Sequence, residues 1–399
     1  CRLLDEYAPQ RHRGSVPLVP QAIELSAEDR ALLDTVRDFA RNELLPLDRR
    51  WDADDSSLFE AMPMLADMGL LNLLVPHEAG GLGCAYPLFA AILHELSVWS
   101  AATSVTLSVH SMVGTIMDRF APEPLRTQLL AGWGRPDHFA AFALSEAGAG
   151  SDASAVRTIA VPAPGGYKIN GEKMWVTNGL SARWLLTLVR LPGLPDRQNF
   201  CTLLVDTTAP GLTRTKIRGK MGIRGSETAV VDYQGVFVPE EHLIGKHGDG
   251  MAVCLSSLGR GRVGIAAQAT GIAEACLAEM VGYARQREQF DQPIGKFQAV
   301  SNMIADSAME LEAAKLLVWR AACGVQSGNV DRRATSMAKL YASEAANRIA
   351  YRAVQVHGGT GYVHECRVEQ LYRDARITTI YEGTSEIQRI VIGRELAAM

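Results

Sequence analysis

Hydrophobic residues recur at two different spacings, and the change from one to the other divides the chain into three parts. In the first part they recur about every three to four residues, which predicts amphipathic helices. Ser26, followed by acidic residues, indicates the start of one helix, and residues 57–71 and 87–119 are predicted to form two more. We therefore expect an N-terminal α-helical domain over residues 26–138.

Short runs rich in β-branched and aromatic residues replace the helical spacing after Asp137. These runs cover residues 158–161, 167–169, 184–189, 200–205 and 230–238. Turn-forming Gly, Pro and Asn residues separate them, so each run is predicted to be a short strand. Residues 139–248 are therefore expected to form a middle β domain, a small barrel or sandwich.

Long, alanine-rich segments without proline follow from about residue 250. The predicted helices of this kind cover residues 262–285, 296–327 and 332–357. Long helices joined by short connections indicate an antiparallel bundle, so we expect a C-terminal α-helical domain over residues 249–399. The predicted fold class is α+β, with an N-terminal helical domain, a middle β-barrel domain and a C-terminal four-helix-bundle domain. A fold of this kind does not by itself determine a function.

Composition and charge narrow the class of protein. The 399 residues are 47% hydrophobic and 21% charged, as in a globular protein, and the net charge of −4 argues against a nucleic-acid partner. Residues 96–117 contain no Asp, Glu, Lys or Arg, but their many hydroxyl groups and His110 are too polar for a membrane span. We expect a buried helix there.

The cysteines and the N-terminal residues give expectations about the compartment. The seven cysteines are scattered and form no CxxC pair, which indicates reduced thiols in a reducing compartment. The expected location is the cytoplasm or, in a eukaryote, the mitochondrial matrix. Residues 1–25 lack the apolar core of a secretory signal and are predicted to form an irregular arm. No His or Cys pair has the spacing of a metal site, so no metal is expected.

A short stretch near the C-terminus contains the principal candidate for chemistry. The β-rich run Ile377–Tyr381 is predicted to be a strand that leads into Glu382 and Gly383, after which Thr384 or Ser385 caps a helix. A carboxylate at such a junction is placed like a general base, because bound substrate would exclude water and raise its pKa. The competing interpretation is an ordinary surface glutamate in a turn.

The helix after this turn has a predicted orientation. Its apolar stripe would contain Ile387, Ile390 and Val391, which leaves Gln388 and Arg389 facing water.

Two stretches of the β domain are candidates for ligand binding. Residues 143–152 form a loop in which glycines allow close approach and Ser145 and Ser151 supply hydroxyls, although an ordinary polar loop is also possible. Residues 174–179 are predicted to be a strand that ends in a turn and carries Trp175 and Thr177. A tryptophan on a strand is usually a core residue, which is the alternative here.

Two ends of the predicted long helices also contain distinctive residues. Arg287 lies just beyond a helix end, where it could simply complement the helix dipole, and Phe290 and Gln298 follow it. Another helix ends near Gln355 with a predicted glycine C-cap at Gly358.

These stretches carry a family resemblance. Tyr381-Glu382-Gly383-Thr384-Ser385 resembles the C-terminal signature of the acyl-CoA dehydrogenase family, whose glutamate is catalytic. The other stretches match the same family in the same order, from about Ser26 to the end of the chain. The resemblance implies an FAD-dependent oxidoreductase that converts an acyl-CoA to a trans-2-enoyl-CoA. Glu382 would remove the α-proton, and N5 of FAD would accept the β-hydride.

The resemblance also implies binding roles. The implied cofactor-binding residues are Phe142, Leu144, Ser145, Trp175, Thr177, Arg287, Phe290, Gln298, Gln355, Gly358, Gly359, Thr384 and Glu386. The implied substrate-binding residues are Ser151, Arg262, Tyr381 and Gly383. Gln355, Gly358 and Gly359 would contact the dinucleotide of a neighbouring subunit, which implies a homo-oligomer, commonly a tetramer in this family. Asp291 stands where the family has a glycine, which weakens the match around Phe290.

Several alternatives stay open at this point. The electron acceptor would be an electron-transferring flavoprotein or oxygen, and the acyl group could be bound to CoA or to an acyl carrier protein. A flavin monooxygenase or N-oxygenase of the same fold is a rival, but such relatives generally lack the glutamate. Some family members place their base near Gly259 or Gly261, where this chain offers no carboxylate. An alternative from a different functional class is a non-enzymatic helical scaffold, which would bind no flavin.

Overall fold

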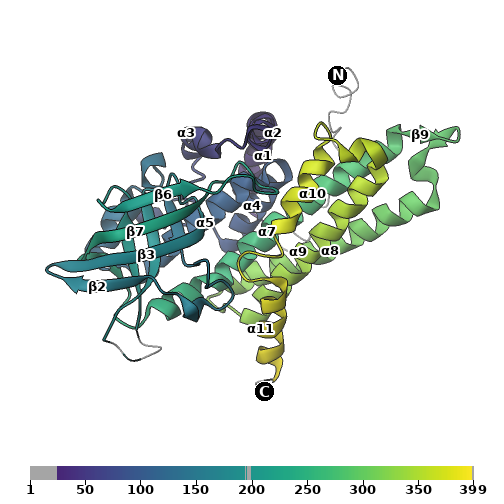
Figure 1. Cartoon of the computed structure of the whole chain (residues 1–399). Helices are drawn as coiled ribbons and strands as arrows, with labels where there is room; N and C mark the ends of the chain where they lie inside the picture. Colours follow the sequence, from purple (N-terminus) through teal and green to yellow (C-terminus); the bar gives the residue numbers. More distant parts are fainter. Residues whose placement is uncertain (1–24, 194, 196–198, 398–399) are drawn as a thin grey trace.

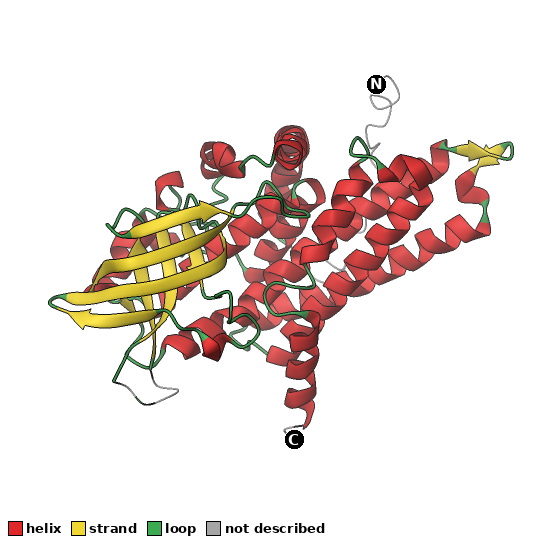
Figure 2. Cartoon of the chain, in the orientation of Figure 1, coloured by secondary structure: helices red, strands yellow, loops and turns green. Residues whose placement is uncertain are grey.

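The computed structural model describes residues 25–193, 195 and 199–397. Most of the predicted N-terminal arm therefore lies outside the described residues. Helices surround one side of a β-sheet domain, and a long helical bundle extends away from it (Figures 1 and 2). Among the described residues, none of the helices combines the length and apolar character needed to cross a membrane.

The N-terminal helices agree with the predicted pattern, with two corrections. They are α1 (Ala27–Phe39), α2 (Leu45–Asp54), α3 (Met62–Asp67), α4 (Tyr86–Trp99), α5 (Ala101–Phe120) and α6 (Glu123–Ala131). Helix α1 begins after Ser26, as predicted, and Ser26 forms a capping box with Asp29 there. The predicted helix over residues 57–71 is instead a short 3-10 helix, Leu58–Ala61, followed by the short α3. The predicted helix over residues 87–119 is interrupted because the Ser100 hydroxyl accepts a hydrogen bond from the Thr103 N–H and starts α5.

The middle part is an eight-stranded sheet in the order β6-β7-β3-β2-β4-β5-β8, with β1 paired to β4. Its strands are β1 (Ala140–Ala143), β2 (Ile159–Ala163), β3 (Gly166–Thr177), β4 (Trp184–Arg190), β5 (Phe200–Asp206), β6 (Leu212–Lys216), β7 (Thr228–Pro239) and β8 (Leu243–Ile244). All five predicted strands are present. The sequence pattern missed β1, β6 and β8, because short strands have too few residues to show a period.

The C-terminal part is an antiparallel bundle around α7. It contains α7 (Gly250–Gln286), α8 (Gln298–Gln326), α9 (Arg332–His357), α10 (Arg367–Ile377) and α11 (Ser385–Ala397), and a hairpin of β9 (Glu288–Gln289) and β10 (Gln292–Pro293) joins α7 to α8. The C-cap of α9 is Gly358 with φ of 59°, as predicted. Helix α7 begins well before the predicted start, because its first turns pack under the sheet domain.

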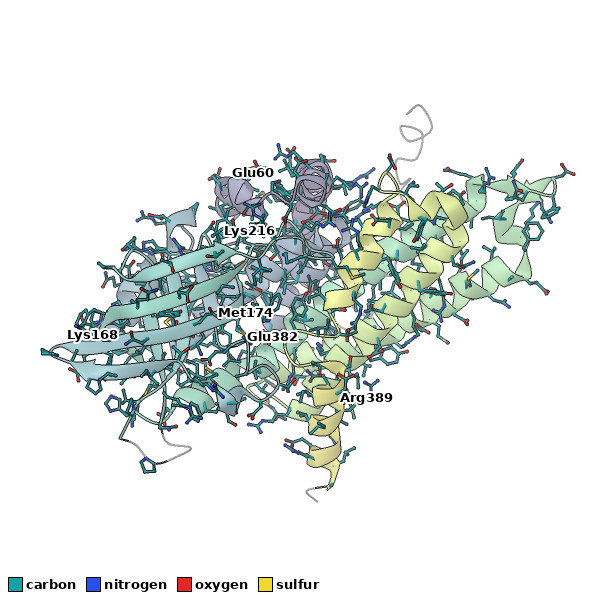
Figure 3. The ribbon with its side chains drawn as sticks, viewed as in Figure 1. Glu60, Lys168, Met174, Lys216, Glu382 and Arg389 are labelled. Carbon is teal, nitrogen blue, oxygen red and sulfur yellow. The ribbon has the colours of Figure 1, made fainter. Side chains whose placement is uncertain are left out.

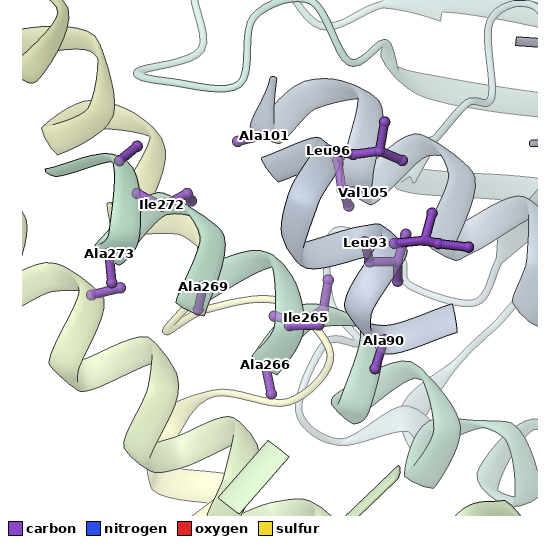
Figure 4. Close-up of a cluster of buried hydrophobic side chains, with 14 of the residues drawn as sticks. Ala90, Leu93, Leu96, Ala101, Val105, Ile265, Ala266, Ala269, Ile272 and Ala273 are labelled. Atoms are coloured by element: carbon purple, nitrogen blue, oxygen red, sulfur yellow. The ribbon is translucent and has the colours of Figure 1, made fainter. Parts of the chain in front are cut away.

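Buried apolar side chains fix α4 and α5 against α7 (Figure 4). The contacting residues include Leu93, Leu96, Val105, Ile265, Ala269 and Ile272. Glycines of α7 allow the helices to approach closely, since a Cβ added to Gly271 would lie 2.6 Å from the Ser97 Cβ of α4. The position of α7 therefore depends on the absence of side chains at this crossing.

The strand predicted at Ile377–Tyr381 is wrong. Helix α10 extends to Ile377, and the next residues continue in tight turns, in which the Ile380 N–H donates to the Ile377 carbonyl at 2.8 Å. The Thr378 hydroxyl donates to the Ala375 carbonyl at 2.7 Å, so it satisfies a carbonyl at the helix end. β-branched residues favour strands only where a neighbouring strand can pair with them, and this segment pairs with none of the described strands.

Replacement of Gly271 by alanine is expected to lower the free energy of unfolding by about 1–3 kcal/mol, because the new Cβ overpacks the crossing of α4 and α7. Gly282→Ala is the matched control on the same helix, since a Cβ there meets nothing within 4 Å. Alanine should stabilise the helix at that position by about 0.5–1 kcal/mol. Urea denaturation of both variants measures the difference. Equal effects of the two substitutions would contradict the close packing of α7.

Candidate active site

Glu382 lies in the turn between α10 and α11, against the middle of α7. A Cβ added to Gly261 of α7 would lie 2.6 Å from Oε2 of Glu382 and 3.2 Å from Sδ of Met112 on α5. The carboxylate therefore occupies space that a side chain at Gly261 would fill. In Figure 3 it is labelled where the sheet domain meets the bundle.

The backbone at Glu382 has an unusual conformation for a residue with a side chain. Glu382 has φ of 51° and Gly383 has φ of 87°, so two successive residues are left-handed. The cost for the glutamate is about 1–2 kcal/mol, whereas glycine adopts this conformation freely. Such strain persists only where surrounding contacts enforce it.

Two buried side chains enforce this turn. The Gln388 side-chain amide of α11 donates to the Glu382 carbonyl at 3.0 Å and to the Gly383 carbonyl at 2.9 Å. Lys339 of α9 donates from Nζ to the same Gly383 carbonyl at 2.8 Å. Gln388 and Lys339 are both 0% exposed. The turn is thus tied to two different helices.

The predicted orientation of α11 is therefore wrong. Gln388 was expected to face water but is buried, while Ile390, expected on the buried stripe, is 45% exposed. The hydrogen bonds of Gln388 to the turn determine which face of the helix is inside. The predicted cap is confirmed, because the Thr384 hydroxyl accepts a hydrogen bond from the Ile387 N–H at 3.3 Å.

One oxygen of the Glu382 carboxyl group is shielded from solvent. Its Oε2 is buried and has no hydrogen-bond partner among the described residues. Burial raises the pKa of Glu382 to about 7, against the opposing effect of the positive charges of Arg262 and Lys339. A carboxylate with a pKa near neutrality can remove a proton and later release it. The interpretation of Glu382 as an ordinary surface residue is therefore wrong.

Arg262 and Tyr381 lie beside this carboxylate and are held by α7 and α9. Arg262 is buried, and its Nη1 donates to the Ser336 hydroxyl at 3.1 Å. The Tyr381 hydroxyl donates to Oε1 of Gln268, whose amide donates to the Ala101 carbonyl at 2.8 Å. The structure thus brings Arg262, Tyr381, Glu382 and Gly383 together.

The predicted β-domain residues form a second group. The Met174 N–H donates to the Ser145 carbonyl at 2.8 Å, which joins the loop after β1 to the end of β3. A register shift between Lys173 and Val176 turns Trp175 outward, with φ of 63° and 57% of its surface exposed. The core interpretation of Trp175 is therefore wrong. Phe142, Leu144, Ser145 and Thr177 are half-buried, and Ser151 is exposed.

A third group lies at the distant end of the bundle. Arg287, Phe290 and Gln298 are exposed around the β9–β10 hairpin, with Phe290 86% exposed. Along α7 this end lies about 39 Å from Gly261, at about 1.5 Å per residue. Gln355, Gly358 and Gly359 are exposed at the same end, where His357 stacks on Tyr283 with ring centroids 4.3 Å apart. A single chain does not bring this group to Glu382.

The presence of Asp291, where the family has a glycine, has a structural basis. Phe290 and Asp291 are the two central residues of the hairpin turn, with φ of 53° and 59°. Both positions of such a turn require positive φ, for which Gly, Asn and Asp are suited. Aspartate can therefore occupy this position with little strain.

Sequence reasoning missed Lys339 and Gln388. A signal for Lys339 was present, because it shares the small-residue face of α9 with Ser336 and Ser343, which are also buried. Gln388 carried no comparable signal. Among the described residues, no group of three or more His, Cys, Asp or Glu side chains could hold a metal ion.

Sequence models of three domains match this chain in order. They are the acyl-CoA dehydrogenase N-terminal domain at residues 26–135, the middle domain at 141–236 and the C-terminal domain at 248–397. The chain belongs to the acyl-CoA dehydrogenase family. Membership of this family makes the protein an enzyme, an oxidoreductase, which excludes the non-enzymatic scaffold.

Relatives of similar length support this assignment. An acyl-CoA dehydrogenase of Bacillus subtilis (strain 168) is 41% identical over 362 residues, which are 90% of this chain and 96% of the relative. The mitochondrial short-chain specific acyl-CoA dehydrogenase of Rattus norvegicus is 39% identical over 380 residues, 95% of this chain and 92% of the relative. The structure of butyryl-CoA dehydrogenase from Megasphaera elsdenii aligns with a TM-score of 0.91 and 34% identity, covering 94% of this chain and 100% of that one. The predicted fold is thereby confirmed.

Gly261→Ala should displace the Glu382 carboxylate, because the new Cβ and Oε2 cannot both remain 2.6 Å apart. A displacement on the order of 1 Å can lower kcat/KM for acyl-CoA oxidation by roughly tenfold to a hundredfold. Gly282→Ala on the same helix should leave kcat/KM unchanged. Unaltered kinetics of Gly261→Ala would show that the carboxylate does not need this space.

Proposed function

We propose that the protein catalyses the α,β-dehydrogenation of a short-chain acyl-CoA to the trans-2-enoyl-CoA, with Glu382 as the base and FAD as cofactor. The observation that supports this most directly is the shielded Glu382 carboxylate beside α7, whose pKa is about 7. A desolvated carboxylate near the α-carbon is what proton removal from an acyl thioester requires.

The turn offers both groups that enolate formation needs. The Cα–H bond of the substrate breaks, its proton goes to the Glu382 carboxylate, and negative charge develops on the thioester oxygen. The Glu382 backbone N–H forms no hydrogen bond with another described residue, so it can donate to that oxygen. Because the turn is held by Gln388 and Lys339, this donor is oriented before the charge develops.

The exposed aromatic surface of the β domain fits a flat cofactor. FAD would supply the acceptor for the hydride that leaves the β-carbon. Trp175 presents an uncovered indole next to Ser145 and Thr177, which can hold the ring system together with Phe142 and Leu144. Thr384 and Glu386 lie at the start of α11, beside the base. Ser151 is exposed on the loop where the thioester's carrier arm would pass.

The distant end of the bundle suits the rest of the dinucleotide in a homo-oligomer, which we propose to be a tetramer. Arg287 supplies charge for a pyrophosphate and Phe290 an exposed ring for an adenine, with Gln298, Gln355, Gly358 and Gly359 around them. Since this group is about 39 Å from Gly261 along α7, it would complete the site of a neighbouring subunit.

The preference for a short acyl chain rests on the relatives of this chain. Two relatives are named for short substrates, one short-chain specific and one butyryl-CoA dehydrogenase. The proposed electron acceptor is an electron-transferring flavoprotein.

Anaerobic addition of butyryl-CoA to the purified protein should bleach its flavin absorbance, with longer acyl-CoAs reacting more slowly. Glu382→Gln should bind FAD and substrate but lower the rate of bleaching by roughly two to four orders of magnitude, because the amide cannot accept the proton. Stopped-flow absorbance measures both. If an acyl carrier protein thioester bleaches the flavin and no acyl-CoA does, the carrier-bound substrate is favoured. If no acyl thioester bleaches the flavin and the reduced flavin reacts with oxygen, an oxygenase is favoured. Rapid bleaching of Glu382→Gln would overturn its assignment as the base.

Coexpression of two inactive variants should restore activity if the site is shared between subunits. Glu382→Gln leaves the distant end intact, and Arg287→Glu leaves the base intact. In a random mixture about a quarter of the sites would combine an intact Glu382 with an intact Arg287 from the neighbour. The recovered kcat per flavin in differently tagged, co-purified oligomers measures this fraction. No recovery in a verified mixed oligomer would place both residues in the same chain's site.

A further inference from the structure

The turn at Glu382 is held by charge as well as by hydrogen bonds. Lys339 is 0% exposed, and its Nζ has the Gly383 carbonyl as its hydrogen-bond acceptor at 2.8 Å. A buried ammonium group is costly unless negative charge compensates it. The negative charge that acts most strongly on Lys339 is the carboxylate of Glu382, one residue before the carbonyl that Lys339 binds.

We propose that Lys339 is a positioning residue that fixes the Glu382 turn through the Gly383 carbonyl and sets the protonation of the Glu382 carboxylate, with Gln388 as its uncharged counterpart. This inference rests on the proposed role of Glu382 as the base. It assigns two different tasks to the two side chains. Lys339 contributes charge and geometry, whereas Gln388 contributes geometry alone.

The electrostatics support the division of tasks. Burial raises the pKa of Glu382, and the positive charges of Arg262 and then Lys339 lower it. Burial lowers the pKa of Lys339 to about 8, and the Glu382 charge opposes that shift. Lys339 is therefore charged below about pH 8, in the range where Glu382 titrates.

Other ionisable groups face this pair from each neighbouring helix. Glu382 is faced by Arg262 of α7, Lys339 of α9, Tyr86 of α4 and its neighbour Tyr381. Lys339 is faced by Glu382, Arg262, Glu344 of the same helix and Glu386 of α11. Arg262 follows Gly261 on α7 and lies beside the carboxylate, but its Nη1 donates to the Ser336 hydroxyl of α9 and not to a carbonyl of the turn. Among the described residues, Lys339 is the cation that binds the backbone of the turn.

The geometry also distinguishes the two donors, Lys339 and Gln388. Gln388 binds both the Glu382 and the Gly383 carbonyls, so it fixes the left-handed pair from the α11 side. Lys339 approaches the Gly383 carbonyl from α9. Loss of either donor leaves a buried carbonyl with fewer partners and relaxes the turn. Only loss of Lys339 also removes a charge that stabilises the carboxylate.

The test is the pH dependence of kcat/KM in the FAD-loaded enzyme. Because the base must be deprotonated, activity should fall as the pH drops through the pKa of Glu382. In Lys339→Met this acid limb should move to higher pH, since an opposing positive charge is gone. If the pKa of Glu382 rises by about one unit, kcat/KM of the variant at pH 6 falls about tenfold relative to the wild type. Any loss that is also present at pH 9 comes on top of this factor.

Matched variants separate charge from structure. Lys339→Arg should keep the wild-type acid limb even if the larger side chain lowers kcat. Gln388→Met should lower kcat at every pH while the limb stays in place. Lys168→Met removes the same charge from the exposed face of β3, far from Glu382 in Figure 3, and should change nothing. Flavin content and melting temperature are measured for each variant.

The outcomes are distinguishable from failure of the proposed function. If Glu382→Gln stays active, Glu382 is not the base and both proposals fall. If Glu382→Gln is inactive but folded Lys339→Met keeps the wild-type acid limb, the role of Lys339 is overturned alone. Should Lys339→Met not fold, Lys339→Gln makes the same comparison, because it keeps a donor and removes only the charge.

Discussion

Desolvation of one carboxylate is the constraint on which the rest of this structure depends. Glu382 can be shielded beside α7 only because Gly261 has no side chain, and α7 can lie so close to its neighbours only because glycines occupy its crossings. The left-handed turn that presents the carboxylate is costly by itself, and buried donors on α9 and α11 offset that cost. The helical bundle is therefore the scaffold that allows a carboxylate to be buried in this turn.

The sequence predicted the parts of the fold that depend on local chemistry. The cap at Ser26, the glycine at Gly358 and the long alanine-rich helices were predicted because each follows from residues close together in the chain. The strand at Ile377–Tyr381 was wrong because pairing depends on distant neighbours, and propensity does not report whether a partner strand is present. Helix boundaries failed where tertiary contacts extend or interrupt a helix, as at the start of α7.

The candidate site also divides into features that depend on local sequence and features that depend on tertiary packing. Glu382 was predicted from its motif, yet its raised pKa comes from burial that no local pattern reveals. Gln388 was predicted to face water because polar residues usually do, but its two hydrogen bonds to the turn outweigh the burial of the apolar residues around it. Lys339 and Gln388 lie far apart in the chain, so only the packing of α9 against α11 reveals that they act on the same carbonyl.

The length of α7 has a consequence for how this protein can change. One continuous helix carries Gly261 beside Glu382, the proposed base, and ends where Arg287 begins the proposed dinucleotide-binding group. Insertion or deletion of a single residue between them would move that end by about 1.5 Å and rotate it by about 100°. Such a change would misalign the Gly261 end and the Arg287 end of the helix relative to each other, whereas substitutions at the surface of α7 leave both in place. Helix α7 should therefore tolerate many exchanges of residue type but almost no change in residue number.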